Sequence, residues 1–351
     1  MQTLILLFFR NKFRESYMMS KRIDYIDIIK GIVIFLVIWV HTSHANWVIP
    51  LLVNSIFFFL SGIFFKRKPF NVFIREKVQS MIVPFLFFYL LSFLYRIVEY
   101  YWDFRDLSSF EWGCIFDVFK FVSHLDYLFV NVPLWFLICL FSTQILYYFI
   151  SFLDKRLIAV VALLCFVFRD FSGSIPSFFM FNGACYYLCF FALGNLVGKP
   201  WIEKLKDIRF RRISLWISIL LSAILFVPIG GFEEWLYDVC YHVKLLMVFF
   251  ILMSIASWFN GKLSLIRYFG ENSLIILGFH VIPLIVLKRI TNAIFGETTI
   301  FAGFVQSVIV MAVMYVVILF CNRYIPFLVG KKHAERALNR TEAAMKVAEQ
   351  R

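Results

Sequence analysis

The sequence predicts an all-α membrane protein with about ten transmembrane helices and both termini in the cytoplasm. Three observations lead to this fold class. Of the 351 residues, 62% are hydrophobic and only 16% are charged, whereas soluble domains are about half apolar and about a quarter charged. Long apolar runs follow one another along most of the chain, and the loops between them alternate in charge.

The apolar runs give the number of predicted helices. A helix needs roughly 20 apolar residues to cross a bilayer, and most of the runs come close to that length, although the fifth is short. The runs are residues 27–46, 51–65, 80–99, 133–152, 157–169, 179–198, 213–230, 240–259, 271–287 and 300–320.

Loop charge gives the predicted orientation. The basic loops are residues 66–77, 154–156, 199–212 and 261–267, joined by the basic C-terminal tail. The intervening loops are poor in Lys and Arg or acidic, with Lys288 and Arg289 as the one exception. Lys and Arg concentrate in cytoplasmic loops, so the basic loops and both termini are predicted to be cytoplasmic. The net charge of +13 is therefore attributed to topology, and no nucleic-acid partner is expected.

The chain divides into three predicted parts: an N-terminal extension (1–20), a transmembrane domain (21–325) and a cytoplasmic tail (326–351). The apolar stretch at the start of the extension is too short to span, and no small-residue cleavage site follows it, so we do not expect a signal peptide. The extension either precedes the true start at Met18 or Met19, which we favour, or is an interfacial amphipathic segment.

The first predicted helix carries ionisable groups into the membrane. Lys30 and His41 are eleven residues apart, about 16 Å of helix at about 1.5 Å per residue. This is about half of a hydrocarbon core roughly 30 Å thick, so His41 is predicted near mid-membrane. Eleven steps of about 100° return to the same face, and Asp27 and His44 fall on the same stripe.

A second intramembrane histidine, His280, follows Glu271 by nine residues, which corresponds to about 14 Å of helix and a depth similar to that of His41. Ionisable groups inside a membrane are functional candidates by default. We therefore place His41, Lys30, Asp27 and His280 in a candidate catalytic site. The alternative is a snorkelling lysine and two core histidines that are hydrogen-bonded independently.

The basic loop Lys66–Lys77 contains Arg75 and Lys77. Such a cluster suits an anionic cofactor with phosphate groups, but spacing alone favours positive-inside charge or contact with anionic lipid. No metal site is expected: His41 and His44 are too few ligands, and the seven cysteines show no CxxC spacing.

Several segments together resemble membrane-bound acyltransferase family 3, bacterial ten-helix enzymes that O-acylate cell-surface sugars. The family motif of Arg or Lys, ten residues and then His is met by Lys30 and His41. The other matching segments, in chain order, are SIFFFLSGIFF, VPLWFLICLF, CFFALGNLVGK and YFGENSLIILGFH. The resemblance covers about residues 22–325 and rests on the order and spacing of these segments.

The resemblance implies that His41 is the catalytic base and that acyl-CoA, with acetyl-CoA expected, is the donor. The family also carries an Arg-x-x-x-Arg pattern before the proline of its third helix. In this chain Pro84 is present, but Gln79 or Ser80 stands at the second arginine position. Arg75 and Lys77, together with Lys30, are therefore the candidate CoA contacts.

These inferences predict an O-acyltransferase, with acetyl the expected group, in the bacterial inner membrane. It would move an acyl group from acyl-CoA to a hydroxyl of a cell-surface polysaccharide or its lipid-linked precursor. The lipid bilayer, acyl-CoA, the glycan acceptor and other polysaccharide-biosynthesis proteins are the expected partners. The main alternative is a transporter or flippase of a glycan or small anion. A membrane scaffold or sensor would not need two histidines at one depth.

Overall fold

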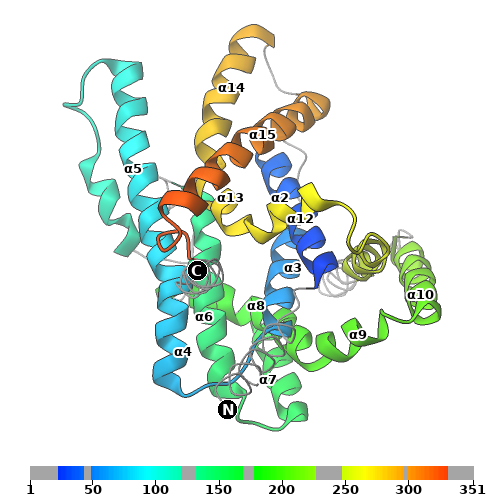
Figure 1. Cartoon of the computed structure of the whole chain (residues 1–351). Coiled ribbons are helices and arrows are strands. Elements are labelled where there is room, and N and C mark those ends of the chain that lie inside the picture. Colours follow the sequence, from blue (N-terminus) through cyan, green and yellow to red (C-terminus); the bar gives the residue numbers. More distant parts are fainter. Residues whose placement is uncertain are drawn as a thin grey trace, which may run out of the picture.

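The computed structural model describes residues 23–42, 49–119, 131–168, 178–226, 247–295 and 299–330. It is 85% helical, without a strand in the described residues, which confirms the all-α prediction. The predicted extension 1–20 and most of the predicted tail 326–351 lie outside the described residues. Figure 1 shows the helices gathered into one bundle.

The principal helices of the first half are α2 (Asp24–Thr42), α3 (Ile49–Ile63), α4 (Phe70–Lys77), α5 (Val83–Phe104), α6 (Trp135–Ile150), α7 (Lys155–Phe168) and α8 (Phe181–Leu193). Those of the second half are α9 (Lys199–Lys204), α10 (Ile208–Phe226), an unlabelled helix (Met247–Trp258), α12 (Ser264–Glu271), α13 (Ser273–Phe279), α14 (Val281–Phe295) and α15 (Ile300–Tyr324). Shorter pieces include the π-helical turns η1 (Val78–Ile82) and η7 (Gly194–Gly198), and the 3₁₀ turns η2 (Trp112–Phe119), η4 (Val132–Leu134) and η6 (Phe178–Met180).

Each of the ten predicted apolar runs falls on a helix, but fewer helices are long enough to span. Five helical stretches of the described residues have the length and hydropathy of a membrane span, or six if the bent pair α13–α14 counts once. The five are Asp24–Thr42, Phe70–Phe104, Val132–Ile150, Phe181–Lys204 and Ile300–Tyr324. These spans make the chain a multi-pass membrane protein. The ten-span count and the cytoplasmic placement of both termini stay predictions.

Close helix crossings set the position of α2. Gly31 in α2 faces α12, and a Cβ atom there would lie 2.1 Å from the Ile266 carbonyl oxygen. Gly270 in α12 faces α2, and its Cβ would lie 1.7 Å from the Asp27 carbonyl oxygen. Only a residue without a side chain permits this approach, which is the usual role of small residues between membrane helices. The crossing fixes the end of α2 that carries Asp27 and Lys30.

A second glycine crossing joins α3 to α8. A Cβ on Gly62 would lie 2.0 Å from the Phe191 carbonyl oxygen, and one on Gly194 would lie 2.1 Å from that of Phe59. Gly62 and Gly194 are thus positions where α3 and α8 pack closely.

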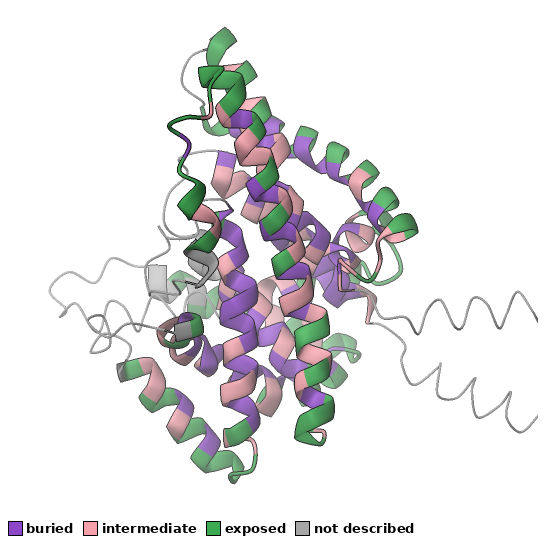
Figure 2. Ribbon diagram, turned by 90° about the vertical axis from the view of Figure 1, so that its left-hand side faces the viewer, coloured by how far each residue is buried: buried purple, intermediate pink, exposed green. Residues whose placement is uncertain are grey.

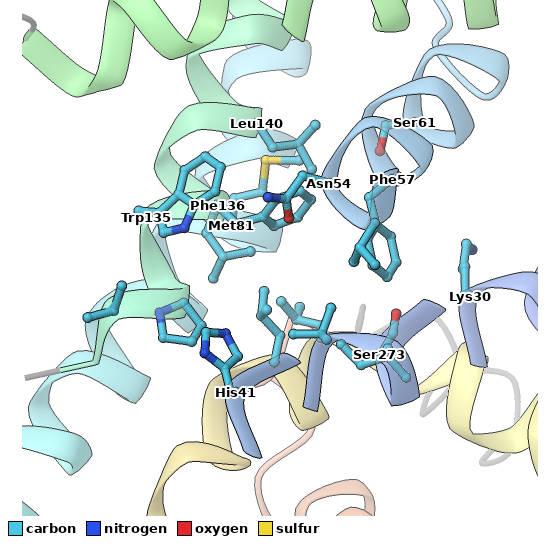
Figure 3. A pocket seen from close by; sticks show the side chains of 18 of the residues that line it. Lys30, His41, Asn54, Phe57, Ser61, Met81, Trp135, Phe136, Leu140 and Ser273 are labelled. Atoms are coloured by element: carbon cyan, nitrogen blue, oxygen red, sulfur yellow. The ribbon is translucent and has the colours of Figure 1, made fainter. Parts of the chain in front are cut away.

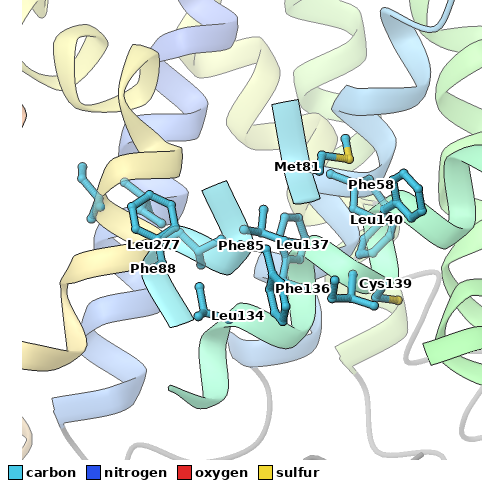
Figure 4. Close-up of a cluster of buried hydrophobic side chains, with 14 of the residues drawn as sticks. Phe58, Met81, Phe85, Phe88, Leu134, Phe136, Leu137, Cys139, Leu140 and Leu277 are labelled. Carbon is cyan, nitrogen blue, oxygen red and sulfur yellow. The ribbon is translucent and has the colours of Figure 1, made fainter. Parts of the chain in front are cut away.

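Aromatic and aliphatic side chains fill the space between the helices. Buried residues concentrate in the middle of the bundle, and exposed ones lie at helix ends and on the outer faces (Figure 2). The larger of two buried clusters joins α5, α6 and α13, and Figure 4 shows part of it around Phe85, Phe88 and Leu137. Phe88 lies against α13, where a Cβ on Gly278 would be 2.4 Å from its ring. This cluster holds α13 in place beside α5.

Four charged side chains connect α5 to α14, and we call them the α5–α14 ion cluster: Arg96, Glu99, Asp103 and Arg289. Arg289 donates to Glu99 at 2.7 Å and to the two Asp103 oxygens at 2.6 and 2.8 Å. Arg96 donates to the other Glu99 oxygen at 2.5 Å. The Arg96–Glu99 pair thus has a structural role. Arg289, one of the two exceptions to the loop-charge pattern, is neutralised locally by these carboxylates.

Candidate active site

A cavity of about 420 Å³ runs along one face of α2, between Lys30 and His41. Lys30, Ile34, Val37 and His41 all line it, at the three-, four- and eleven-residue spacings that keep side chains on one helix face. Figure 3 shows Lys30 and His41 at separate ends of this face, with residues of α3 and α6 opposite. Two members of the stripe predicted from the sequence, Lys30 and His41, therefore lie on one wall of a cavity.

The other walls are mainly apolar, with a few polar groups at intervals. They come from α3, η1, η4, α6 and α13, so the cavity joins segments that are far apart in the sequence. The lining residues outside α2 are Val53, Asn54, Phe57, Ser61, Ser80, Met81, Val132, Pro133, Trp135, Phe136, Leu137, Leu140, Ser273, Leu274 and Leu277; Val40 of α2 also contributes. An apolar cavity with a few convergent polar groups is the usual form of a small-molecule site.

The Lys30 end of the cavity is anchored by an ion pair. Lys30 Nζ lies 3.1 Å from Asp27 Oδ1, one turn earlier on α2. Asp27 itself is buried and does not line the cavity, whereas the Lys30 side chain is partly exposed there. Asp27 thus balances and orients the lysine, and Lys30 is the group that meets the cavity.

The His41 end is fixed by contacts between α2 and α15. Thr42 Oγ1 lies 2.9 Å from the Gly303 carbonyl oxygen and 3.2 Å from Ser307 Oγ, both in α15. These buried contacts hold the C-terminal turn of α2 beside the neighbouring helix. His41, one residue earlier, is directed into the cavity from this anchored turn.

His280 lies next to His41, as the depth estimate predicted. The two ring centroids are 5.6 Å apart, with an angle of 39° between the ring planes. His280 stands at the break between α13 and α14, which are bent by 51° relative to each other. Its side chain is fully buried, and its Nδ1 lies 2.9 Å from the Ile276 carbonyl oxygen. The structure therefore brings Lys30 and His41 to one cavity and places His280 beside His41.

The predicted CoA contacts on α4 lie elsewhere. Arg75 is exposed, and Lys77 lies over the ring of Phe73 at 5.6 Å; neither lines the cavity. Ser80, a position where the family pattern would have its second arginine, does line it, from the π-helical turn η1. π-Helical turns are rare and often occur at functional sites. His44, the last member of the predicted stripe, lies outside the described residues.

Sequence reasoning missed the polar residues that face α2 across the cavity. Asn54 and Ser61 of α3 line it together with Phe57, at the three- and four-residue spacings of one helix face. The available signal was that Asn54 and Ser61, seven residues apart, lie on one face of a mostly apolar helix. Within the described residues, no group of three or more His, Cys, Asp or Glu side chains could hold a metal ion.

These features define a class: a multi-pass helical membrane protein with two adjacent histidines, the buried His280 and His41, of which His41 lines a mainly apolar cavity. The chain belongs to membrane acyltransferase family 3, because the family model, described as an acyltransferase domain, matches residues 23–323. It is accordingly an acyltransferase. No curated protein and no solved structure shows a significant match to the chain.

Proposed function

We propose that this protein transfers an acyl group, with acetyl the expected one, from acyl-CoA to a hydroxyl of a cell-surface polysaccharide or its lipid-linked precursor. The bacterial inner membrane is its proposed location. The observation that carries the proposal is the single cavity that joins Lys30 at one end to His41 at the other, with His280 beside His41. Family membership identifies the reaction as acyl transfer. The cavity supports acyl-CoA as the donor and His41 as the base.

The cavity suits an acyl-CoA donor. Loop charge predicts that the Lys30 end faces the cytoplasm, where acyl-CoA is available. Lys30 there offers a cation to the phosphates of CoA, held in place by Asp27 at 3.1 Å. The apolar wall between Lys30 and His41 would receive the pantetheine arm and place the thioester near His41. The acceptor would then approach His41 from the other side of the membrane.

His41 would act as the general base. It takes the proton of the acceptor hydroxyl while the oxygen attacks the thioester carbonyl carbon. A C–O bond forms, the C–S bond breaks, and the proton passes from His41 to the departing CoA sulfur. The products are the sugar ester and free CoA. Asn54 and Trp135, which line the cavity, each offer an N–H donor that could stabilise the developing oxyanion.

One observation favours the transporter alternative. The break between α13 and α14 resembles the discontinuous helices that form substrate sites in transporters, and it lies at His280. A transporter would move the glycan without changing it covalently, so the two functions differ in whether the acyl group reaches the glycan.

The deciding experiment adds radiolabelled acetyl-CoA to membranes that contain the wild type or His41→Ala. We expect label in the polysaccharide or lipid-linked sugar fraction with the wild type and none with the variant. Equal amounts of both proteins in the membrane are the control. Absence of label from both samples, together with failed glycan export in a deletion strain, would favour the transporter and reject the proposal.

A further inference from the structure

The break at His280 is stabilised by side chains that bind the carbonyl groups at the end of α13. His280 Nδ1 lies 2.9 Å from the Ile276 carbonyl oxygen and 3.1 Å from that of Leu277. The Gly278 carbonyl accepts from Asn131 Nδ2 at 3.0 Å. The Ile276 carbonyl also accepts the backbone N–H of His280 at 3.0 Å, and carbonyl groups in the last turn of a helix are commonly bound by side chains where the regular backbone bonds end. The bend is therefore a specified part of the fold.

These contacts determine which nitrogen of His280 carries the proton. A carbonyl oxygen can only accept a hydrogen bond, and both neighbours of Nδ1 are carbonyl oxygens. Nδ1 must therefore be the N–H donor. In the neutral ring the other nitrogen, Nε2, then has a lone pair and no proton, so it acts only as an acceptor.

Nε2 is buried and has no hydrogen-bond partner in the described part of the chain. The whole His280 residue is 0% exposed. Buried acceptors are rarely left unpaired, and an exception calls for a specific explanation. The ring of His41 lies beside that of His280, with the two ring centroids 5.6 Å apart. Catalytic hydrogen bonds are often long in the absence of substrate and shorten in the reacting complex.

We propose that His280 is a positioning residue that acts through His41, an inference that rests on the proposed function. His280 Nε2 accepts a hydrogen bond from one N–H of the His41 ring. The other His41 nitrogen is then unprotonated and directed to the cavity, where it takes the proton of the acceptor hydroxyl. In many catalytic sites a third group orients the base that activates the attacking nucleophile. In this site the orienting group is a neutral imidazole.

Two substitutions separate this role from support of the helix break. In His280→Gln the side-chain amide reaches the position of Nε2, so an acceptor for His41 is retained and the bond to the Ile276 carbonyl is lost. In His280→Asn the amide reaches only the position of Nδ1, so a donor to the carbonyl is retained and the acceptor for His41 is lost. The two variants are matched amides that differ by one methylene group.

The test measures kcat and KM for radiolabelled acetyl-CoA, per amount of monodisperse purified protein returned to vesicles with a glycan fraction from the same cells. Thermal unfolding of each variant is recorded in parallel. We expect His280→Asn to lose about 10²-fold or more in kcat, and His280→Gln to keep clearly more activity, with KM for acetyl-CoA unchanged in both. The expected order of thermal stability is the reverse, because Asn preserves the bond to the carbonyl.

If His280→Asn is as active as His280→Gln or more so, His280 serves only the helix break and the inference is wrong. If the wild type itself produces no His41-dependent label, the proposed function fails instead. The two failures are therefore distinguishable in one series of samples.

Discussion

Two places in this bundle bring polar side chains into apolar surroundings, and they differ in how completely those side chains are paired. In the α5–α14 ion cluster, Glu99 accepts from Arg96 at 2.5 Å and from Arg289 at 2.7 Å, and Arg289 also binds Asp103. At the histidine pair, His280 binds its own helix through Nδ1, and Nε2 has no partner within the described residues. The histidine pair adjoins a cavity through His41.

This difference in pairing assigns the α5–α14 ion cluster to the stability of the fold and the histidine pair to catalysis. Charges that satisfy one another hold two helices together and leave no capacity for a ligand. A buried polar atom without a partner has a cost, and such sites are retained where the unpaired atom takes part in function. The comparison predicts that changes at the histidine pair reduce catalysis in a folded protein. Changes at the ion cluster should reduce stability and leave catalysis intact.

The largest expected effect follows His41→Ala. Loss of the general base should reduce acyl transfer by about 10³-fold or more, since general acid–base catalysis contributes about 10²- to 10⁴-fold. Insertion and folding should stay normal. Transfer of label from acetyl-CoA and the gel-filtration profile of the purified protein measure the two properties. Leu36→Ala, which changes a residue of α2 outside the cavity lining, is the control and should keep most activity. A fully active His41→Ala protein would eliminate the mechanism.

Lys30→Met should have the second-largest effect, on donor binding. Without the cation we expect the KM for acetyl-CoA to rise about 10-fold, in line with the 1.4 kcal/mol that corresponds to one decade in affinity. The change also leaves the buried Asp27 carboxylate without its partner at 3.1 Å, which should lower the thermal unfolding midpoint.

Asp27→Asn combined with Lys30→Met is the matched control for that loss of stability. It removes both charges, so the unfolding midpoint should recover while the KM for acetyl-CoA stays high. If KM recovers together with stability, Lys30 acts on the fold rather than on the donor.

The sequence predicted the two ends of the site because they lie on one regular helix. Constant rise and rotation convert the spacing of Lys30 and His41 into a distance and a shared face. The estimate for His280 used the same rise per residue, and the structure brings its ring beside that of His41 although Asn272 interrupts the helix between α12 and α13. Hydrophobic runs likewise predicted where the long apolar helices would lie, but not the short helices α4, α9 and α12 between the runs.

The other features of the site could not be predicted, and the number of spanning helices could not be fixed, because both depend on tertiary structure. Asn54 and Ser61 face the cavity because the Gly62–Gly194 crossing rotates and holds α3, and spacing within one helix gives no partner helix. The ten-span count stays a prediction, because hydropathy measures composition and not helix length. α7 contains 14 residues, which is about 21 Å of helix against a hydrocarbon core of about 30 Å.

Glu99→Gln tests the other side of the comparison. The neutral side chain weakens the bonds to both Arg96 and Arg289, and we expect a loss of about 1–3 kcal/mol in stability, reduced because the Arg289 side chain is 44% exposed. Thermal unfolding in detergent measures the loss. Activity per amount of folded protein should equal that of the wild type. A specific loss of acyl transfer would mean that the ion cluster belongs to the catalytic machinery.

The smallest expected effect is that of Arg75→Ala. The family pattern made Arg75 a candidate CoA contact, but its side chain is exposed on α4 and lies outside the cavity that Lys30 enters. Water weakens and salt screens the attraction between an exposed cation and a phosphate, so this interaction contributes only a few tenths to about 1 kcal/mol to binding. We therefore expect a rise of about 2- to 5-fold in the KM for acetyl-CoA, with kcat unchanged and a stronger effect at low salt. Because Lys30 is only partly exposed and is paired with the buried Asp27, whereas Arg75 is exposed, raising the salt concentration should abolish the Arg75 effect and leave more of the Lys30 effect. A KM that is unchanged at every salt concentration would remove Arg75 from the donor site and leave Lys30 as the cation that meets the CoA phosphates.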